Sequence, residues 1–429
     1  MTEAVDSRFV AAREAIHGVC FAPTREDARQ VGVEVELLVC DAATRQPVRL
    51  LGGDRCLIAL LRRHAAERGW AETEAHGGVP RFVVGREAII SFEPGGQVEI
   101  STVACNSASS AAAVARTIAL TLRARLADEG IDLASRGIDP VNDAANIPLQ
   151  LPHERYRQMT EYLERISPFG IRMMRQTAAI QVSIDRGPRP AERWRLLNDL
   201  VPYVIAIFAN SRRYLGADSG HQSYRAHCWR MLDPRRTGIV SAGGDPAGEY
   251  ARFALNAPDM TRRNGEDAYA AFADWPRDGT TDARWATHLT TLFPEVRPRG
   301  HFEVRSCDAI DPAWYVVPIV FLCGLAYDEH AAREAAVLAA DSRSLLRLGG
   351  RRGLGDSAIA RTARDLFQLA LAGARRLGDG YVNQDDRAVA EQYYAEYTGR
   401  DRAPADDAYG ASRREPSGMP VREASLPPA

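Results

Sequence analysis

Four short segments of this chain alternate apolar residues with charged or amide-bearing residues, and this alternation constrains the fold more than any other feature. The segments read VGVEVELL at 31–38, FEPGGQVEIS at 92–101, TAAIQVSID at 177–185 and HFEVRS at 301–306. Because successive side chains of a strand point to opposite faces, each segment predicts a strand with one apolar and one polar face. Carboxylates gathered on one face repel one another unless cations lie between them, and their hard oxygens suit magnesium, which usually arrives with substrate phosphates. The pattern therefore indicates a sheet whose polar face binds magnesium and a nucleotide.

Glu34 and Glu36 are expected to project from the same face of the first strand. A lone E-x-E pattern is weak evidence, because solvated carboxylates are common on exposed sheet faces. The second segment adds Glu93 and Glu99 on either side of a Pro-Gly-Gly turn, whose glycines allow the backbone to approach a ligand closely. The coincidence of these patterns favours a metal site.

The strand at 177–185 supplies uncharged polar groups. Its apolar residues are expected to face the core, while the other face carries Thr177, Gln181, Ser183 and Asp185. Uncharged donors beside carboxylates suit a surface that orients a polar substrate. A solvated antiparallel strand explains this segment alone equally well.

The last strand places a carboxylate two residues from an arginine. Alternation predicts that Glu303 and Arg305 share a face with His301 and Cys307. The pair could be a surface ion pair, worth well under about 1 kcal/mol. In the functional interpretation, Glu303 holds magnesium and the planar guanidinium of Arg305 stabilises charge on a phosphoryl group during transfer.

Residues 223–250 are polar and arginine-rich, which is typical of an active-site loop. Its arginines are Arg225, Arg230, Arg235 and Arg236. Such a cluster fits a clamp for a substrate carboxylate or for ATP phosphates, but its charge equally fits a solvated loop.

Composition excludes several classes of function. With 429 residues, 45% of them hydrophobic, the chain can bury a large core, and its net charge of -2 gives no general attraction to nucleic acid or anionic membrane. The chain contains no lysine, so all 54 basic residues are arginine. P-loop enzymes, protein kinases and pyridoxal enzymes are thereby excluded, because each needs a specific lysine. The expected partners are small molecules.

The sequence gives no indication of export or of a membrane span. Its N-terminus lacks the basic start and apolar stretch of a signal peptide, and the longest apolar runs, at 200–209 and 316–326, are shorter than the about 20 residues that cross a bilayer. Seven scattered cysteines without a C-x-x-C pair indicate free thiols in a reducing compartment. We expect a cytoplasmic protein.

Strand and helix patterns alternate at irregular intervals, and the half-polar strands indicate an α+β fold, an antiparallel sheet with helices on its other face. Further strands are expected at 81–90 and 131–139. Pro202 is expected to kink or interrupt its helix. Residues 401–429 are poor in apolar side chains and are expected to form a disordered tail. The expected helices are 8–19, 57–68, 107–129, 153–166, 191–210, 312–339, 356–377 and 384–398.

Six stretches occur in the order found in one enzyme family. They are VGVEVELLV, FEPGGQVEIS, MMRQTAAIQVSID, FANSRRYLG, YRAHCWRMLDPRRTG and HLTTLFPEVRPRGHFEVRSCDA, and they run from residue 31 to about residue 309. On these stretches the chain resembles the glutamate–cysteine ligases of the plant and actinobacterial type, and more distantly the wider carboxylate–amine ligases.

The resemblance implies a single ATP-dependent catalytic domain over residues 1–400. It implies a curved antiparallel β-sheet cradle of the glutamine-synthetase-like kind, with helices packed on its outer face, that binds ATP and Mg2+. In the implied reaction, ATP phosphorylates the γ-carboxylate of L-glutamate, and the amine of L-cysteine displaces phosphate to give γ-glutamylcysteine. The expected context is thiol biosynthesis such as that of ergothioneine.

The resemblance also implies roles for individual residues. The expected metal and substrate-amine carboxylates are Glu34, Glu36, Glu93, Glu99 and Glu303. Arg305 and Arg299 are expected at the ATP phosphates, and Arg305 with Glu303 is expected to be catalytic. The expected glutamate pocket comprises Thr177, Gln181, Ser183, Arg225 and Arg236.

Four residues depart from the family pattern: Ser183 replaces an asparagine, His301 an aliphatic residue, Cys307 an isoleucine or glycine, and Leu232 a threonine. They leave open a ligase that couples another acid or another amine. A phosphotransferase on a related sheet would release a stable phosphorylated product instead of free phosphate. A non-catalytic nucleotide-binding relative would lack the carboxylates that this chain retains.

Overall fold

The computed structural model describes residues 2–25, 29–74, 78–240, 243–262, 269–275 and 281–407. Its central element is a nine-stranded antiparallel sheet of order β12-β13-β7-β1-β5-β4-β3-β2, with β6 paired to β1. The strands are β1 (Val31–Asp41), β2 (Ala71–Glu74), β3 (Pro80–Val84), β4 (Ala88–Phe92), β5 (Val98–Thr102), β6 (Ile131–Ala134), β7 (Ala179–Ile184), β12 (Val296–Pro298) and β13 (Phe302–Asp308). Two short pairs lie outside it, β8 (Arg213–Tyr214) with β9 (Ala217–Asp218) and β10 (Thr237–Gly238) with β11 (Phe293–Pro294).

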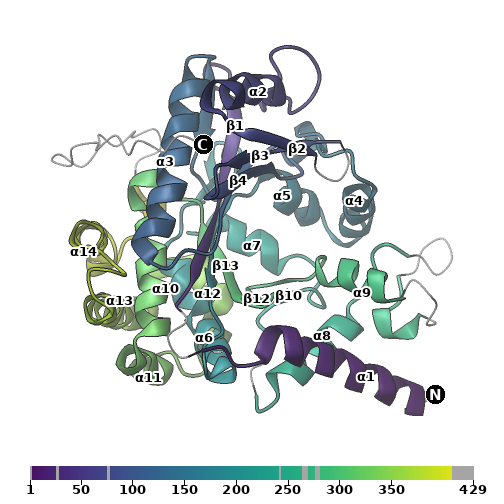
Figure 1. Ribbon diagram of the computed structural model, residues 1–429, viewed down its shortest axis with the longest axis vertical. Helices are drawn as coiled ribbons and strands as arrows, with labels where there is room; N and C mark the ends of the chain where they lie inside the picture. Colours follow the sequence, from purple (N-terminus) through teal and green to yellow (C-terminus); the bar gives the residue numbers. More distant parts are fainter. Residues whose placement is uncertain are drawn as a thin grey trace.

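The helices surround this sheet, and α3 and α10 pack directly against its central strands (Figure 1). Ser107 caps α3 by accepting a hydrogen bond from the backbone N–H of Ser110 at 3.1 Å, as its position before the helix predicts. The helices are α1 (Thr2–Ile16), α2 (Leu57–Arg68), α3 (Ala108–Ala127), α4 (Glu154–Ile166), α5 (Phe169–Gln176), α6 (Pro190–Ile207), α7 (Tyr224–Arg230), α8 (Pro246–Asn256), α9 (Thr281–Leu289), α10 (Val316–Tyr327), α11 (Glu329–Leu338), α12 (Leu346–Arg352), α13 (Ser357–Leu377) and α14 (Gln384–Glu396).

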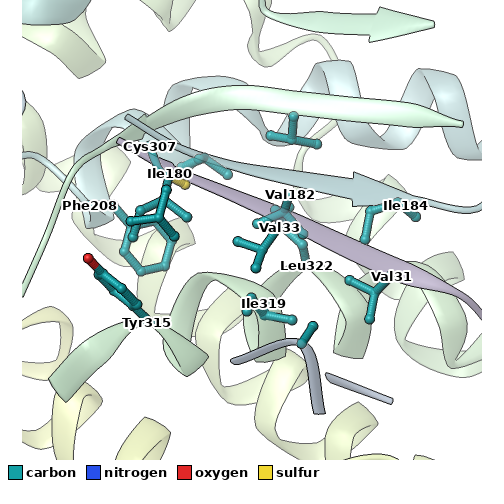
Figure 2. Close-up of a cluster of buried hydrophobic side chains, with 14 of the residues drawn as sticks. Val31, Val33, Ile180, Val182, Ile184, Phe208, Cys307, Tyr315, Ile319 and Leu322 are labelled. Carbon is teal, nitrogen blue, oxygen red and sulfur yellow. The ribbon is translucent and has the colours of Figure 1, made fainter. Parts of the chain in front are cut away.

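The apolar face of the central strands forms the core. Val33 of β1 and Val182 of β7 are paired across the sheet, and Figure 2 shows them beside Ile319 and Leu322 of α10. Every residue of α10 is buried, as expected for a helix that is apolar all round. The predicted α+β class, an antiparallel sheet with helices packed on its apolar face, is confirmed, and further helices lie on other sides of the sheet (Figure 1).

Some predicted element boundaries are wrong. Residues 81–90 form two strands, because Gly85 turns the chain at φ 54°. The predicted helix over 312–339 is interrupted at Asp328, whose side chain accepts from the N–H of Ala331 at 2.8 Å and starts α11. Helix α6 continues through Pro202.

The predicted loop at 223–250 contains two helices. Ser223 caps α7 by accepting from the N–H of Ala226 at 3.1 Å, and Asp245 caps α8 by accepting from the N–H of Gly248 at 3.1 Å. Pro246 occupies the first turn of α8, where its missing N–H does no harm.

Most of the predicted tail lies outside the described residues, which end at 407; Pro404–Asp406 form a short 3-10 helix. In the part of the chain that the structure describes, no helix is both long and apolar enough to cross a membrane.

Candidate active site

The polar face of the sheet brings predicted site carboxylates together. Across the β1–β5 pair, Glu36 is directly opposite Glu99, and Glu34 is directly opposite Ser101. Directly opposed Cβ atoms lie about 4.5–5.5 Å apart, so Glu36 and Glu99 are close neighbours. The hydroxyls of Ser91 and Ser101 donate to Oε1 of Glu99 at 2.8 and 3.1 Å.

Three carboxyls of this face have raised pKa values because they are buried close to other carboxylates. Burial, with a further contribution from Glu99, raises the pKa of Glu36 to about 7. Burial and the charges of Glu99 and Glu303 raise the pKa of Glu34 to about 8. The pKa of Glu93 is well above its ordinary value, because of burial, Glu99 and Glu36. A cation at this face would favour the ionised form of all three.

Glu303 has the opposite environment, because arginines surround it. Arg297 donates from Nε to Oε2 at 2.7 Å and from Nη2 to Oε1 at 3.1 Å, while Nη1 of Arg305 donates to Oε2 at 2.9 Å. Nη1 of Arg299 lies 3.8 Å from Oε1. Burial alone would raise the pKa of Glu303, but the charges of Arg297 and Arg305 lower it well below the ordinary value.

Arg297 is the residue of this cluster that the sequence analysis missed. It is buried and stands directly opposite Glu303 in the β12–β13 register. The available signal is the R-P-R-G turn before Glu303, where Gly300 adopts φ 83° and reverses the chain. The predicted Arg299 is half-exposed at the outer edge of the cluster, and Arg297 and burial lower its pKa.

A β-bulge decides which residues of β13 face the site. The register passes from Val304 opposite Val182 to Cys307 opposite Ile180, so two residues of β13 span one of β7. Cys307 is therefore buried on the apolar face, where Figure 2 shows it near Ile180 and Phe208. The prediction that Cys307 shares a face with Glu303 is wrong, because simple alternation assumes an unbroken register.

Gln181 and Ser183 of β7 lie on the polar face. Nε2 of Gln181 donates to Oε1 of Glu36 at 2.9 Å, and the N–H of Ala179 donates to Oε2 of Glu36 at 2.8 Å. Oε1 of Gln181 is buried and has no hydrogen-bond partner among the described residues. Ser183 lies between Glu303 and Gly32 in the cross-strand register. Gln181 thus orients Glu36 and keeps one acceptor for a ligand.

Thr177 and the Pro-Gly-Gly turn contact protein groups. The Thr177 hydroxyl donates to the carbonyl oxygen of Met173 at 2.6 Å, and its own carbonyl accepts from Nε2 of Gln97 at 2.9 Å. A Cβ at Gly95 would lie 2.1 Å from the carbonyl oxygen of Arg175. The glycine is therefore required by the approach of α5. The turn fixes the end of β4, which Glu93 follows directly, and the start of β5, which carries Glu99.

Arg225 reaches the site from α7. Its Nη2 donates to the carbonyl oxygen of Arg305 at 2.7 Å, and its Nη1 lies 3.8 Å from Oδ1 of the buried Asp308. Arg225 and Arg305 both line a small cavity, together with Trp229 and Ser306.

Arg236 lies in a different, fully buried environment. Its Nη1 donates to the carbonyl and hydroxyl oxygens of Thr291 at 3.0 and 2.9 Å, and its guanidinium lies over the Tyr162 ring, 4.7 Å from the centroid. Its Nε and Nη2 have no hydrogen-bond partner in the described part of the chain. The two arginines predicted to form one clamp therefore have different protein partners.

The donor set fits magnesium that is bound together with a phosphate ligand. Among the described residues, no three carboxyl, imidazole or thiol groups converge into a preformed metal cage. Magnesium rarely uses such cages; it keeps several waters and binds through one or two carboxylates plus substrate phosphates. Opposed carboxylates with raised pKa values beside an arginine cluster match that requirement.

Fold, site and sequence similarity together define an enzyme of the carboxylate–amine ligase class. The family model of glutamate–cysteine ligase family 2 (GCS2) matches residues 30–392. The chain belongs to this family.

Individual relatives agree with this assignment. The chain is 35% identical over 343 residues to the glutamate–cysteine ligase EgtA of Mycobacterium tuberculosis, covering 75% of this chain and 76% of that protein. It is 27% identical over 395 residues to the chloroplastic glutamate–cysteine ligase of Medicago truncatula, covering 85% of this chain and 76% of that protein.

Two solved structures are more distant. A complex between the prokaryotic ubiquitin-like protein Pup and its ligase PafA matches with a TM-score of 0.38 and 13% identity, covering 87% of this chain and 65% of that chain. A bifunctional glutathione synthetase from Pasteurella multocida matches with a TM-score of 0.38 and 12% identity, covering 90% of this chain and 53% of that chain.

Proposed function

We propose that this protein uses ATP and Mg2+ to join the γ-carboxylate of L-glutamate to the amine of L-cysteine, giving γ-glutamylcysteine, ADP and phosphate. The observation that carries the proposal is the placement of the opposed pair Glu36 and Glu99 on the same sheet face as the arginine-bound Glu303. This placement supports a cation site and a phosphate site on one face of the sheet.

Metal binding is assigned to the five carboxylates of this face. At one end, one or two of Glu36, Glu93 and Glu99 would bind magnesium together with a phosphate, and Glu34 and Glu303 would do so at the arginine end. When bound, magnesium would neutralise the triphosphate and allow a carboxylate to approach it. Arg297 competes with a metal for Glu303, so it serves as a positioning residue that fixes this carboxylate.

Arg305 and Arg299 are assigned to the phosphates of ATP. Arg305 carries the catalytic role, because its Nη1 contacts Glu303 while its buried Nε has no hydrogen-bond partner among the described residues. A planar fork with an unused donor suits a phosphoryl group whose charge grows during transfer. Arg299 is half-exposed and fits the outer phosphates.

Glutamate binding is assigned to Gln181, Ser183, Arg225 and Arg236, with Thr177 supporting the pocket through its contacts to the turn. Arg236 is the strongest candidate for the α-carboxylate, because a buried guanidinium with two unpaired nitrogens favours an anionic partner. Gln181 offers its unpaired Oε1 to the substrate amine.

The reaction balances in two steps. A γ-carboxylate oxygen of glutamate attacks the terminal phosphorus of ATP, the bond to ADP breaks, and γ-glutamyl phosphate forms. The cysteine nitrogen then attacks the acyl carbon, the carbon–oxygen bond to phosphate breaks, and the amine proton is lost to a base. The protein holds both substrates in place, which makes each step effectively intramolecular.

Of the four residues that depart from the family pattern, only two are placed where they could affect the choice of substrate. Cys307 and Leu232 are buried in apolar surroundings, Leu232 with Trp229 and Phe293, so neither can contact an amine. Ser183 lies on the polar face, and His301 lies two residues from Glu303 and is partly exposed. Ser183 and His301 are therefore the positions at which a different acid or amine would be selected.

The test is phosphate release from ATP and Mg2+ with L-glutamate, alone and with a panel of amines headed by L-cysteine, with product masses. Cysteine-dependent release with a γ-glutamylcysteine mass supports the proposal. Release only with another acid or amine would keep the ligase and change its substrates, and a stable phosphorylated product would indicate a phosphotransferase. A cytoplasmic location and a role in thiol synthesis such as that of ergothioneine belong to the same proposal.

A further inference from the structure

A second cavity lies against α7. It has a volume of about 210 Å³ and is bounded by residues of α6, α7, α12 and the segment before α7. Helix α12 contacts both α6 and α7, and the three helices lie close together in Figure 1. Ala226 of α7 lines both this cavity and the small cavity at Arg305, so both cavities lie against the same helix. The basic residues of the second cavity are His221, His227, Arg230, Arg347 and Arg351.

The cavity has excess positive charge. None of its lining residues is acidic. Arg347 and Arg351 lie four residues apart on α12, and both are exposed. Within the part of the chain that the structure describes, neither guanidinium has a hydrogen bond or an ion pair. Like charges at this spacing repel on one helix face. Arg230 has a single carboxylate partner, and its buried Nε has no hydrogen-bond partner among the described residues.

The two histidines of the cavity, His221 and His227, lie close together. Their ring centroids are 4.1 Å apart. Burial, His221 and the positive charges of Arg347 and Arg172 lower the pKa of His227 to about 4, so this ring is neutral and can accept or donate one hydrogen bond near pH 7.

The chemistry of the lining selects a class of ligand. Two unpaired guanidinium charges match the charge of a phosphate monoester, which is about -1.5 to -2 at pH 7, better than the single charge of a carboxylate. Guanidinium forks also bind phosphate oxygens in pairs. The remaining lining, which includes Ile205 and Leu346, is apolar and suits a small apolar body attached to the phosphate.

We propose that this cavity binds a small organic phosphate and thereby regulates the enzyme. Arg230 connects this cavity to the active site, because it lines the cavity and its Nη2 pairs with Oε1 of Glu295 at 2.5 Å. Oε2 of Glu295 accepts from the Ser306 hydroxyl at 2.7 Å, and its carbonyl accepts from the N–H of Arg305 at 3.0 Å. An anion that draws Arg230 into the cavity releases Glu295 and loosens the strand that carries Arg305, so occupancy slows turnover.

Binding is tested by calorimetric titration of the full chain with phenyl phosphate, inorganic phosphate and benzoate. The informative variant is Arg347→Gln with Arg351→Gln, and the matched control is Arg352→Gln with Arg361→Gln, which removes the same charge from exposed positions outside the cavity. Phenyl phosphate should bind wild type and control alike and at least about tenfold more weakly to the informative variant, because charge-assisted hydrogen bonds are lost. Inorganic phosphate and benzoate should bind more weakly than phenyl phosphate. Equal affinity in both double variants, or equal affinity for benzoate, would overturn the proposal.

The regulatory part rests on the proposed function, whereas binding does not. With ATP, glutamate and cysteine saturating, phenyl phosphate should slow turnover of wild type and control but not of the Arg347→Gln/Arg351→Gln variant. Equal inhibition of that variant would place the effect at the active site and overturn the regulation. A chain without ligase activity would contradict the proposed function and leave the binding test intact.

Discussion

Glu36 of β1 stands directly opposite Glu99 of β5 on the polar face of the sheet, and its two oxygens accept hydrogen bonds from Gln181 and from the Ala179 N–H. Directly opposed like charges destabilise a strand pair. The hydrogen bonds nevertheless hold Glu36 in this position. The repulsion between the two carboxylates lowers the stability of the metal-free protein, and a bound cation would remove this repulsion.

Glu36→Gln should raise the stability of the metal-free protein while abolishing activity. It removes one of two opposed charges, a gain of roughly 1 kcal/mol. Turnover should fall more than about 100-fold, because losing a ligand exceeds the usual effect of losing an outer-shell partner. Thermal unfolding with and without Mg2+ and ATP, together with steady-state rates, measures both effects. Glu74→Gln, the same change at an exposed position of β2, should alter neither, and near-normal turnover of Glu36→Gln would refute the metal assignment.

The stability gain of Glu36→Gln should depend on pH. The folded protein raises the pKa of Glu36 from 4.5 to about 7, so folding takes up a proton between these values, and stability is lost as pH rises through this range. His227 and His288, whose pKa values are lowered to about 4, act in the opposite direction in both proteins and cancel in the comparison. The difference in unfolding temperature between variant and wild type should widen from pH 5 to pH 8 without metal. A constant difference would show that Glu36 has no raised pKa.

Arg305→Lys should reduce the turnover number far more than it changes the KM for ATP. Lysine keeps the positive charge but lacks the planar guanidinium. In the wild type, this group contacts Glu303 through Nη1 and has an Nε without a hydrogen-bond partner among the described residues. We expect a loss of about 10²- to 10³-fold in kcat, as for removal of one transition-state donor. Arg299→Lys, at a half-exposed position, should cost much less. Equal losses in kcat and in ATP affinity would assign Arg305 to ground-state binding instead.

Arg297→Met should destabilise the protein by about 3 kcal/mol, because it removes the bidentate partner of a fully buried carboxylate. The loss lies at the lower end of the range for broken buried pairs, since Arg305 still contacts Glu303. Adding Glu303→Gln should recover part of it, because the unpaired charge is removed. Denaturant unfolding of the single and double variants measures the coupling, and additive losses would show that the two side chains do not stabilise each other.

The two-faced strands were predictable because alternation is a local property. In β1, Val33 and Val35 face the core while Glu34 and Glu36 face the site, as their spacing requires. The start of α3 was predictable for the same reason, since Ser107 caps the helix that follows it.

The missed features depend on the register between strands and on packing. Arg297 sits in a three-residue strand that is too short to show alternation, and only pairing with β13 turns it toward Glu303. Cys307 lies on the apolar face because of a β-bulge between Val304 and Cys307, and the residue pattern of β13 does not predict this bulge. Asp328 is one acidic residue in a long helical pattern, and its capping role follows from where α10 ends.

Formation of γ-glutamyl phosphate can be followed through one oxygen atom of glutamate. L-glutamate labelled with oxygen-18 in its γ-carboxylate is incubated with the protein, ATP, Mg2+ and L-cysteine, and the released phosphate is analysed by mass. If the polar face catalyses acyl phosphate formation, each phosphate carries one labelled oxygen from glutamate. Unlabelled phosphate, or ATP cleavage that does not require glutamate, would contradict the account.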